Sequence, residues 1–341
     1  ELSDTSLSTS RRFGVTTPVD RLNPVAGQFP EVNAENFPGA GRRVEWQSDS
    51  TTEAFFMEAA YNMTEQLLLV GGLRYDNIEL ERTTDDLNTD IQTEYGQDYD
   101  PLSSRIGIVY DFTSDTNLYA QYSRAVTPIS NFLLMSSNNA KFDLSVGDAY
   151  ELGIKSSFWN NKGDITASIY HITQDDILTR DPQAPSLTVQ GGKKQSYGLE
   201  VAMSAAFTEQ FRIDTSFALL NAELTELTES TGIDRSGNRP ANVVEQQASI
   251  SAYYQLSQLP LILGLTARYS GDFYTNTAND YKIDGYTLLD AQLIWQSSIG
   301  RFTLRGRNLT DELYADWSGY GPTQLYLGAP RSVDLTYSHS F

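Results

Sequence analysis

The feature that most constrains this chain is a two-residue alternation of apolar and polar side chains, which recurs along most of its length. In the stretch EQLLLVGGLRYDN, the odd positions from Leu67 to Tyr75 are apolar or glycine, whereas the even positions include Arg74 and Asp76. Successive side chains of a β-strand point to opposite faces, so this period predicts antiparallel strands with one apolar face. The apolar positions carry no Asp, Glu, Lys or Arg in this stretch or in SRIGIVYDF, TNLYAQYSR, YELGIKSSF, GLEVAMSAAF, QFRIDTSFALL, QQASISAYY, LILGLTARYS, LLDAQLIWQ and RFTLRGR.

The connections between these predicted strands alternate between short and long. Short polar turns are expected at 62–65, 113–116, 160–163, 208–209, 257–260 and 297–300. Long polar loops are expected at about 83–102, 127–147, 179–195, 225–241 and 272–284. Short turns at one end and long loops at the other are typical of an outer-membrane β-barrel, whose turns face the periplasm. A soluble β-sandwich or propeller is the alternative, but a sandwich joins its strands by connections of mixed length.

Aromatic residues gather beside the short turns, where a barrel would carry its periplasmic girdle of aromatic side chains. These residues are Tyr61, Tyr110, Phe158, Trp159, Phe207, Tyr254, Trp295 and Phe302. The last stretch, PRSVDLTYSHSF, also alternates, and it ends on Phe341. We expect its odd positions to face lipid and His339 to be an interfacial residue.

Charge and residue usage exclude several classes of function. The chain has 44 Asp and Glu against 24 Lys and Arg, a net charge of -20, which argues against a nucleic-acid partner. It has no cysteine and only two histidines, His171 and His339, so thiolate and histidine-rich metal sites are not expected. No apolar stretch approaches the roughly 18 to 20 residues of a membrane-spanning helix. No phosphate-binding loop or nucleophile elbow is present, and we predict no enzyme, catalytic residue, metal site or cofactor.

Two acidic features have alternative interpretations. The stretch DDLNTD is loosely similar to a calcium loop, but it lacks the glycine and the bidentate glutamate, which favours a solvated acidic loop. The pairs Asp175 with Asp176 and Glu223 with Glu226 could be imagined as glycosidase carboxylates. Carboxylates on a loop or on the wall of a lumen are the ordinary explanation.

The number of predicted strands is close to the number that a closed barrel would have. Six hairpins from Thr51 onward and a final strand give about 13 strands, and DTSLSTSRRFGV near the start adds one more, an even total that could close. The chain begins at Glu1 without an initiator or signal peptide, so we expect a mature or truncated fragment.

Several motifs together resemble those of TonB-dependent outer-membrane receptors. The stretch RFTLRGRNLTDELYADW is similar to their NLFDxxY element through Asn308, Leu309, Asp311 and Tyr314. The stretch YLGAPRSVDLTYSHSF is similar to their closing GxPR strand through Gly328, Pro330, Arg331 and Phe341. RLNPVAGQFPE resembles the NPVYG stretch of the siderophore-receptor branch. Other similar stretches are NLYAQYSRAVTP, AYELGIKSSF, IYHITQDDIL and SYGLEVAMSA, so the resemblance covers essentially the whole chain in family order.

This resemblance implies the C-terminal portion of a barrel of about 22 strands whose lumen holds a plug. Residues 1–341 would be a partial β-barrel domain, with the plug domain and the TonB box not in this sequence. The implied function is import of a ferric siderophore across the bacterial outer membrane with TonB-coupled energy. The implied partners are the siderophore, outer-membrane lipid and lipopolysaccharide, TonB through the absent N-terminal part, and the barrel-assembly machinery through Phe341.

The resemblance also directs attention to aromatic residues of the long loops as ligand contacts. The predicted ligand-binding residues are Tyr95, Tyr99, Phe132, Tyr197, Tyr274, Trp317 and Tyr320. The loop from Asp85 to Asp100 is acidic and has no basic residue, which predicts a neutral or cationic chelate such as a ferric hydroxamate. Transport of cobalamin, another metal complex or a glycan, and a passive porin or channel, are the alternatives.

Overall fold

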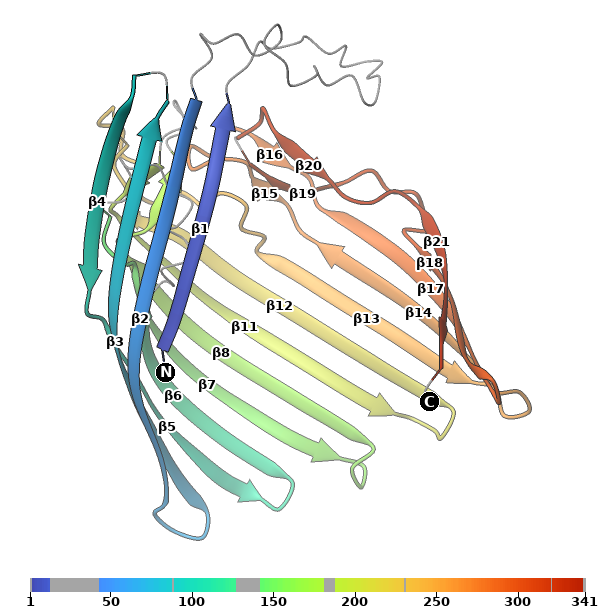
Figure 1. Cartoon of the computed structure of the whole chain (residues 1–341). Helices are drawn as coiled ribbons and strands as arrows, with labels where there is room; N and C mark the ends of the chain where they lie inside the picture. The colour runs from blue at the N-terminus through green and yellow to red at the C-terminus, as the bar shows by residue number, and fades with distance from the viewer. Residues whose placement is uncertain are drawn as a thin grey trace, which may run out of the picture. The chain divides into compact units, whose positions relative to one another are not determined.

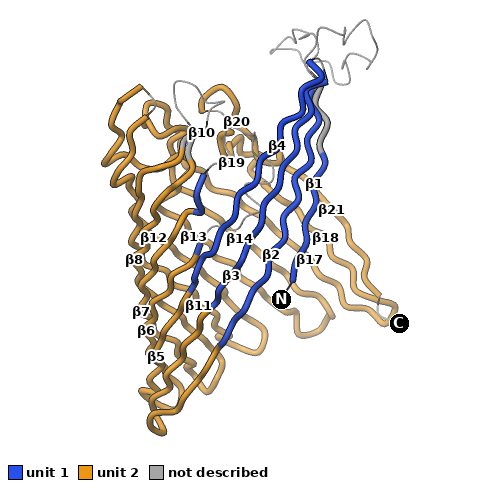
Figure 2. The backbone as a smooth tube through the Cα atoms, turned by 60° about the vertical axis from the view of Figure 1, so that its left-hand side comes forward, with its two compact units in different colours: residues 1–57, 74–103, 126–144 blue, residues 58–73, 104–125, 145–341 orange. Residues whose placement is uncertain are grey.

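The computed structural model describes residues 2–12, 43–87, 89–126, 142–180, 188–229, 231–319 and 321–339. Throughout these residues the regular secondary structure is β-strand. No helix in the described part of the chain is long and apolar enough to cross a membrane. The chain divides into two compact units: residues 1–57, 74–103 and 126–144, and residues 58–73, 104–125 and 145–341 (Figure 2).

Among the described residues, fourteen strands follow one another along a single sheet, and β4 pairs only with β3. The sheet confirms the expected strand beside the N-terminus and the thirteen that follow it. In sheet order the strands are β1 (Leu2–Arg12), β2 (Arg43–Asn62), β3 (Leu67–Asp86), β5 (Leu102–Thr113), β6 (Thr116–Val126), β7 (Val146–Phe158), β8 (Gly163–Asp175), β11 (Lys193–Ala206), β12 (Phe211–Glu226), β13 (Gln246–Gln255), β14 (Leu261–Ser270), β17 (Tyr286–Ser297), β18 (Gly300–Arg307) and β21 (Ser332–Ser338).

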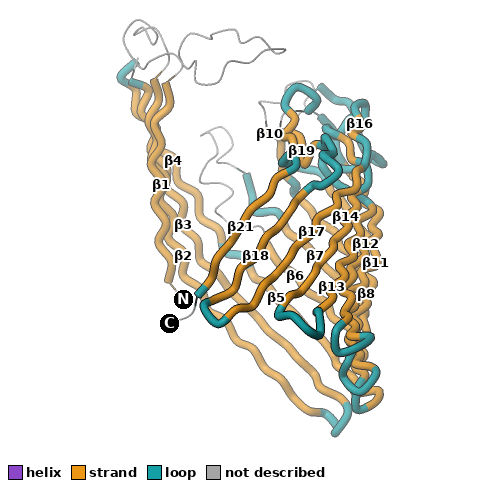
Figure 3. Tube along the Cα trace, turned by 90° about the vertical axis from the view of Figure 1, so that its right-hand side faces the viewer, coloured by secondary structure: helices purple, strands orange, loops and turns teal. Residues whose placement is uncertain are grey.

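All six predicted short turns are confirmed, because each joins two strands that are neighbours in the sheet. All six lie in the second unit, after β2, β5, β7, β11, β13 and β17, at the lower edge of the strands (Figure 1). The loops of this unit lie at the opposite edge and contain three small hairpins (Figure 3). These hairpins are β9 with β10 (Leu178–Arg180, Thr188–Gln190), β15 with β16 (Phe273–Tyr274, Lys282–Ile283) and β19 with β20 (Ala315–Ser318, Leu325–Leu327).

The sheet of the second unit has one apolar face that no other layer of the described residues covers. The antiparallel register aligns Leu152 with Ile169 and Ile169 with Leu199, so apolar side chains form continuous rows across the strands. Leu152 and Ile169 are each 54% exposed and Leu265 is 63% exposed. A soluble protein would bury such rows against another layer. An uncovered apolar face is what a strand facing lipid requires.

The predicted clustering of aromatic residues beside the short turns is confirmed at two places. The Phe158 and Trp159 rings lie 5.0 Å apart, and the Trp159 and Phe207 rings 5.4 Å apart. Further along the sheet, Phe302 lies between Trp295 and Tyr337, at 5.2 and 4.9 Å. These rings come from strand ends and short turns at one edge of the sheet.

The first unit departs from the prediction in two places. Strand β2 begins at Arg43, eight residues before the expected start at Thr51. The segment 83–102 is not mainly loop, because β3 runs on to Asp86 and pairs with β4 (Ile91–Tyr99). Ile78 and Leu80 are buried on one face of this hairpin, and that burial stabilises a ladder that the many acidic residues conceal in the sequence.

Candidate ligand-binding loops

Three loops of the second unit, 227–245, 271–285 and 308–331, are joined by side chains that bond to backbone groups far away in sequence. Asn242 is the centre of one junction. Its backbone N–H donates to the Tyr274 carbonyl at 2.8 Å, and its amide Nδ2 donates to the Ser318 carbonyl at 2.9 Å. The Ser318 N–H donates back to Asn242 Oδ1 at 2.8 Å. One asparagine therefore fixes the β15–β16 hairpin and the β19–β20 hairpin relative to each other.

Arg239 is the centre of a second junction. Its Nη1 lies 3.0 Å from Glu245 and its Nη2 lies 2.6 Å from Asp272, while the guanidinium sits over the Tyr274 ring at 4.7 Å. The hydrogen bond from Arg239 holds the pKa of the Asp272 carboxyl below its usual value. Asn279 closes the junction, because its side chain bonds to both the N–H and the carbonyl of Arg239, at 2.9 and 2.8 Å.

Exposed aromatic surface lies directly beside these junctions. The rings of Trp317 and Tyr326 stack face to face, with centroids 4.2 Å apart and an interplanar angle of 4°. Trp317 is 46% exposed and Tyr326 is 41% exposed, so the stacked pair presents an aromatic surface to solvent. Stacked, half-exposed rings beside ordered polar groups are suited to bind a bulky ligand that has apolar edges and a few polar groups.

Two of the predicted contact residues, Tyr274 and Trp317, come together at these loops. Asn242 connects the loops that carry them, bonding to the backbone of Tyr274 and of Ser318, which follows Trp317. The sequence prediction missed Asn242 and Arg239. Their one local signal is a run of polar residues around Pro240, which indicates a loop but says nothing about its contacts.

The other predicted contact residues lie elsewhere. Tyr197 is exposed, but the register aligns it with His171, and His171 with Tyr150, on the apolar face of the sheet. Tyr95 and Tyr99 belong to the first unit. Tyr95 donates to Gln97 at 3.0 Å. Phe132 and Tyr320 lie outside the described residues.

Tyr99 is a buried residue of the β3–β4 hairpin. Only 7% of it is exposed, and its hydroxyl donates to the Phe142 carbonyl at 2.8 Å. Strand β3 has 20 residues, about twice what a tilted strand needs to cross a bilayer, so its pairing with β4 lies beyond the spanning part. Burial raises the pKa of Tyr99 to about 12, which suits a packing role for its ring.

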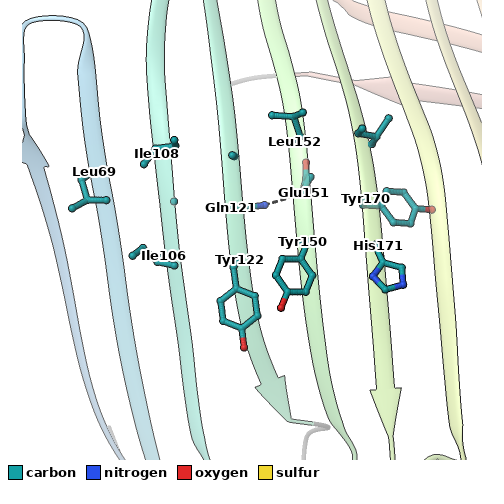
Figure 4. A pocket seen from close by; sticks show the side chains of 13 residues that line it. Leu69, Ile106, Ile108, Gln121, Tyr122, Tyr150, Glu151, Leu152, Tyr170 and His171 are labelled. Atoms are coloured by element: carbon teal, nitrogen blue, oxygen red, sulfur yellow. Dashed lines mark hydrogen bonds between the residues drawn. The ribbon is translucent and has the colours of Figure 1, made fainter.

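A groove of about 680 Å³ lies on the apolar face of the second unit and is separate from the loops (Figure 4). Ile106, Ile108 and Leu152 line it, and Tyr122 and Tyr150 lie side by side with ring centroids 5.0 Å apart. Gln121 and Glu151 also border it, with Gln121 Nε2 donating to Glu151 at 2.7 Å. Because this face is apolar and uncovered, the groove faces the acyl chains of the membrane. Among the described residues, no group of three or more His, Asp or Glu side chains could hold a metal ion.

The motif around Asn308 has a structural explanation. Asn308 is buried, its Nδ2 donates to the carbonyls of Glu312 and Ala329, and its Oδ1 accepts from the Glu312 N–H at 2.8 Å. Asp311 accepts from the Arg331 N–H at 3.0 Å. A Cβ on Gly328 would lie 1.9 Å from the Tyr314 ring, so any larger residue there would force the ring to move. These residues fold the connection between β18 and β21 back on itself.

Comparison with known proteins agrees with this architecture. The chain is 28% identical over 340 residues to the ferrichrome outer membrane transporter/phage receptor of Escherichia coli, covering 96% of this chain and 43% of that protein. It is 26% identical over 276 residues to the ferrioxamine receptor of Yersinia enterocolitica, covering 79% and 37%.

A solved structure shows the same fold. The siderophore receptor PiuA from Acinetobacter baumannii superposes with a TM-score of 0.78 at 20% identity, over 98% of this chain and 51% of that one. The chain spans about half the length of these known proteins, or somewhat less.

The family model for the TonB-dependent receptor-like β-barrel matches residues 3–309, which is most of the chain. The apolar face of the sheet is therefore the lipid-facing side of an outer-membrane barrel, and the polar face lines its lumen. The chain belongs to the TonB-dependent receptor β-barrel family.

Proposed function

We propose that the chain is part of an outer-membrane receptor that binds a ferric siderophore and imports it with energy coupled through TonB. The names of the ferrichrome and ferrioxamine receptors support a ferric chelate as the ligand. Residues 1–341 would belong to the barrel domain, and the plug domain and TonB box implied by the family would lie outside them. Lipopolysaccharide and the barrel-assembly machinery would be its other partners. The family is one of receptors and transporters, and we propose no enzymatic step.

The observation that carries the proposal is the joined loop cluster around Asn242 and Arg239. It holds the Tyr274 backbone and the Trp317–Tyr326 stack in one unit of the protein, on loops at the edge opposite the short turns. A preorganised site loses less ordering entropy when a ligand binds than separate mobile loops would. Tyr274, Trp317 and Tyr326 are therefore the residues we propose as ligand contacts.

We propose a neutral or cationic chelate, of the ferric hydroxamate type, as the ligand. The β3–β4 hairpin carries Asp85, Asp86, Asp90, Glu94 and Asp98, and Asp100 follows it. Such a concentration of negative charge repels anions that approach from solution. A triply anionic chelate would reach this receptor more slowly than a neutral one.

The test is iron uptake by cells whose only siderophore receptor is the full-length protein. We expect labelled iron to enter with ferrichrome or ferrioxamine when TonB is present, and to stop entering when TonB is deleted. The double variant Tyr274→Ala, Trp317→Ala should weaken binding of the purified receptor by roughly 10-fold or more. Tyr197→Ala, on the lipid-facing side, is the matched control and should leave binding unchanged.

Three outcomes would overturn the proposal. Uptake of cobalamin or a glycan without any ferric chelate would assign another substrate. Ion conductance in planar bilayers with no TonB requirement for uptake would indicate a passive channel. Tight uptake of ferric citrate alone would contradict the hydroxamate class.

A further inference from the structure

The lumen-facing side of β14, β17 and β18 carries a cluster of arginines that the proposed function does not use. Arg268, Arg305 and Arg307 line a pocket of about 510 Å³, in which Asp290 is the one carboxylate among the lining side chains. The whole chain carries a net charge of -20, so this part of the wall has the opposite sign to the protein as a whole. Pockets of this volume are large enough for a small ligand.

Strand register explains why these side chains meet. Gln292 on β17 is aligned with Arg305 on β18 and with Gly264 on β14. A Cβ on Gly264 would lie 2.7 Å from the Gln292 side chain, so the glycine leaves the space that Gln292 occupies. The glycine thus leaves room for the Gln292 side chain, which is aligned with Arg305.

The carboxylates near the pocket do not satisfy all of its guanidinium groups. Asp290 accepts from Arg268 at 2.7 Å through one oxygen and from the Asn308 N–H at 2.8 Å through the other, so both of its oxygens are engaged. Asp334 lies 3.4 Å from Arg307. Arg305 bonds to the neutral amide oxygen of Gln292, at a long 3.4 Å. The register aligns Arg305 with Asp334 on β21 as well as with Gln292 on β17, and Asp334 also pairs with Arg307. Three guanidinium groups thus share two carboxylates.

We propose that this pocket is an oxyanion-binding site in the lumen wall, which takes a carboxylate or phosphate group of a small ligand. A guanidinium offers five N–H donors in a planar fork that matches both groups. Arg305 and Arg307 supply the donors, and Arg268 with Asp290 holds the edge of the site. The inference stands independently of the siderophore proposal, because it rests on other residues in another part of the chain.

The experiment uses the purified full-length receptor in detergent, titrated calorimetrically with two iron-free probes, inorganic phosphate and citrate. We expect saturable binding of at least one probe that weakens as salt is added. Arg305→Gln and Arg307→Gln should each weaken it roughly 10-fold. Gln292→Glu, which adds a carboxylate beside Arg305 on the β17 side, should abolish it while leaving every arginine in place.

Arg212→Gln is the matched control. Arg212 lies on β12, its side chain is 58% exposed, and it pairs with Asp214 at 2.7 Å, away from the pocket. We expect this variant to bind as the unaltered receptor does. Heat-modifiable mobility on gels shows whether each variant is folded.

Binding of phosphate alone or citrate alone would distinguish the two oxyanion classes, and either supports the site. Failure of the unaltered receptor to bind both probes would overturn it. Equal weakening by Arg212→Gln and Arg305→Gln would also overturn it, because the effect would then be one of net charge. A receptor that binds an oxyanion here but no ferric chelate would refute only the proposed function.

Discussion

Asn242 and Ser318, 76 residues apart in sequence, exchange two hydrogen bonds of 2.8 and 2.9 Å between an asparagine side chain and a strand backbone. The Asn242 backbone is in the left-handed region, with φ at 61°. The Asn242 side chain thus pairs with the Ser318 backbone as a neighbouring strand would, and it joins two loops.

Replacing Asn242 by glycine should loosen both hairpins without straining the backbone. Glycine tolerates the left-handed conformation, so the loss of stability measures the two side-chain hydrogen bonds, about 1 kcal/mol each. Hydrogen exchange at Ser318 and Thr275 should become faster. Asn161→Gly, also left-handed but at a short turn, is the control and should leave these amides unchanged. Unchanged exchange in Asn242→Gly would mean that the hairpins hold each other by other contacts.

Acid should loosen the Arg239 junction. The pKa of Asp272 is lowered in the folded protein, chiefly by the hydrogen bond from Arg239. Its contribution to stability is therefore present at neutral pH and is lost as the pH falls below about 4, the ordinary value for Asp. Proteolysis of the 227–245 loop by an acid-active protease should accelerate in that range.

The variant Arg239→Gln supplies the comparison. Without the guanidinium the pKa of Asp272 returns towards its usual value, so the loop should be cleaved faster at neutral pH and show less additional change on acidification. An identical acid response in both proteins would exclude Asp272 as the titrating group.

A charge on the apolar face should be costly, although the site is exposed. Leu265→Arg lies in the middle of β14 on the uncovered face, where an arginine at the bilayer midplane costs about 2–4 kcal/mol. Thr266→Arg, on the next residue, points into the lumen and is the matched control. Folding into lipid vesicles followed by urea titration measures both. Equal stability of the two variants would contradict the assignment of the faces.

Gly328→Ala should destabilise the connection between β18 and β21. The added methyl would meet the Tyr314 ring at 1.9 Å, and overpacking of this kind typically costs about 1–3 kcal/mol. Gly71→Ala, where the nearest atom is 3.9 Å away, should be tolerated. The double variant Gly328→Ala, Tyr314→Ala should recover part of the loss, measured as the heat-modification temperature. Failure to recover would place the clash elsewhere.

The strands and short turns could be predicted because alternation is a local property of the sequence. Leu67 to Tyr75 shows its apolar face without reference to any other strand. The β3–β4 hairpin was missed because its acidic residues are typical of a loop, while the burial of Ile78 and Leu80 depends on neighbours that the sequence does not specify. Alternation also carried a signal about Tyr197 that the prediction did not use, since Tyr197 has the parity of Leu199 and Val201.

The ligand-binding loops were predictable only as loops. Aromatic content pointed to Tyr274 and Trp317, but the residue that connects their loops, Asn242, forms its bonds across 76 positions. A hydrogen bond between distant residues that depends on one polar side chain produces no periodic pattern in the sequence. The arginine pocket was missed for a related reason: Arg268, Arg305 and Arg307 lie on two strands separated in the sheet by β17, and only the register brings them together.

The uncovered apolar rows of the second unit also mean that the free energy of unfolding belongs to the chain together with its surroundings. Residues such as Leu152 and Ile169 gain their stabilisation from hydrocarbon, whether it comes from a lipid or from a detergent tail. A melting temperature of this protein therefore describes a protein–amphiphile assembly. Changing the chain length of the detergent should alter it as a core mutation alters a soluble domain.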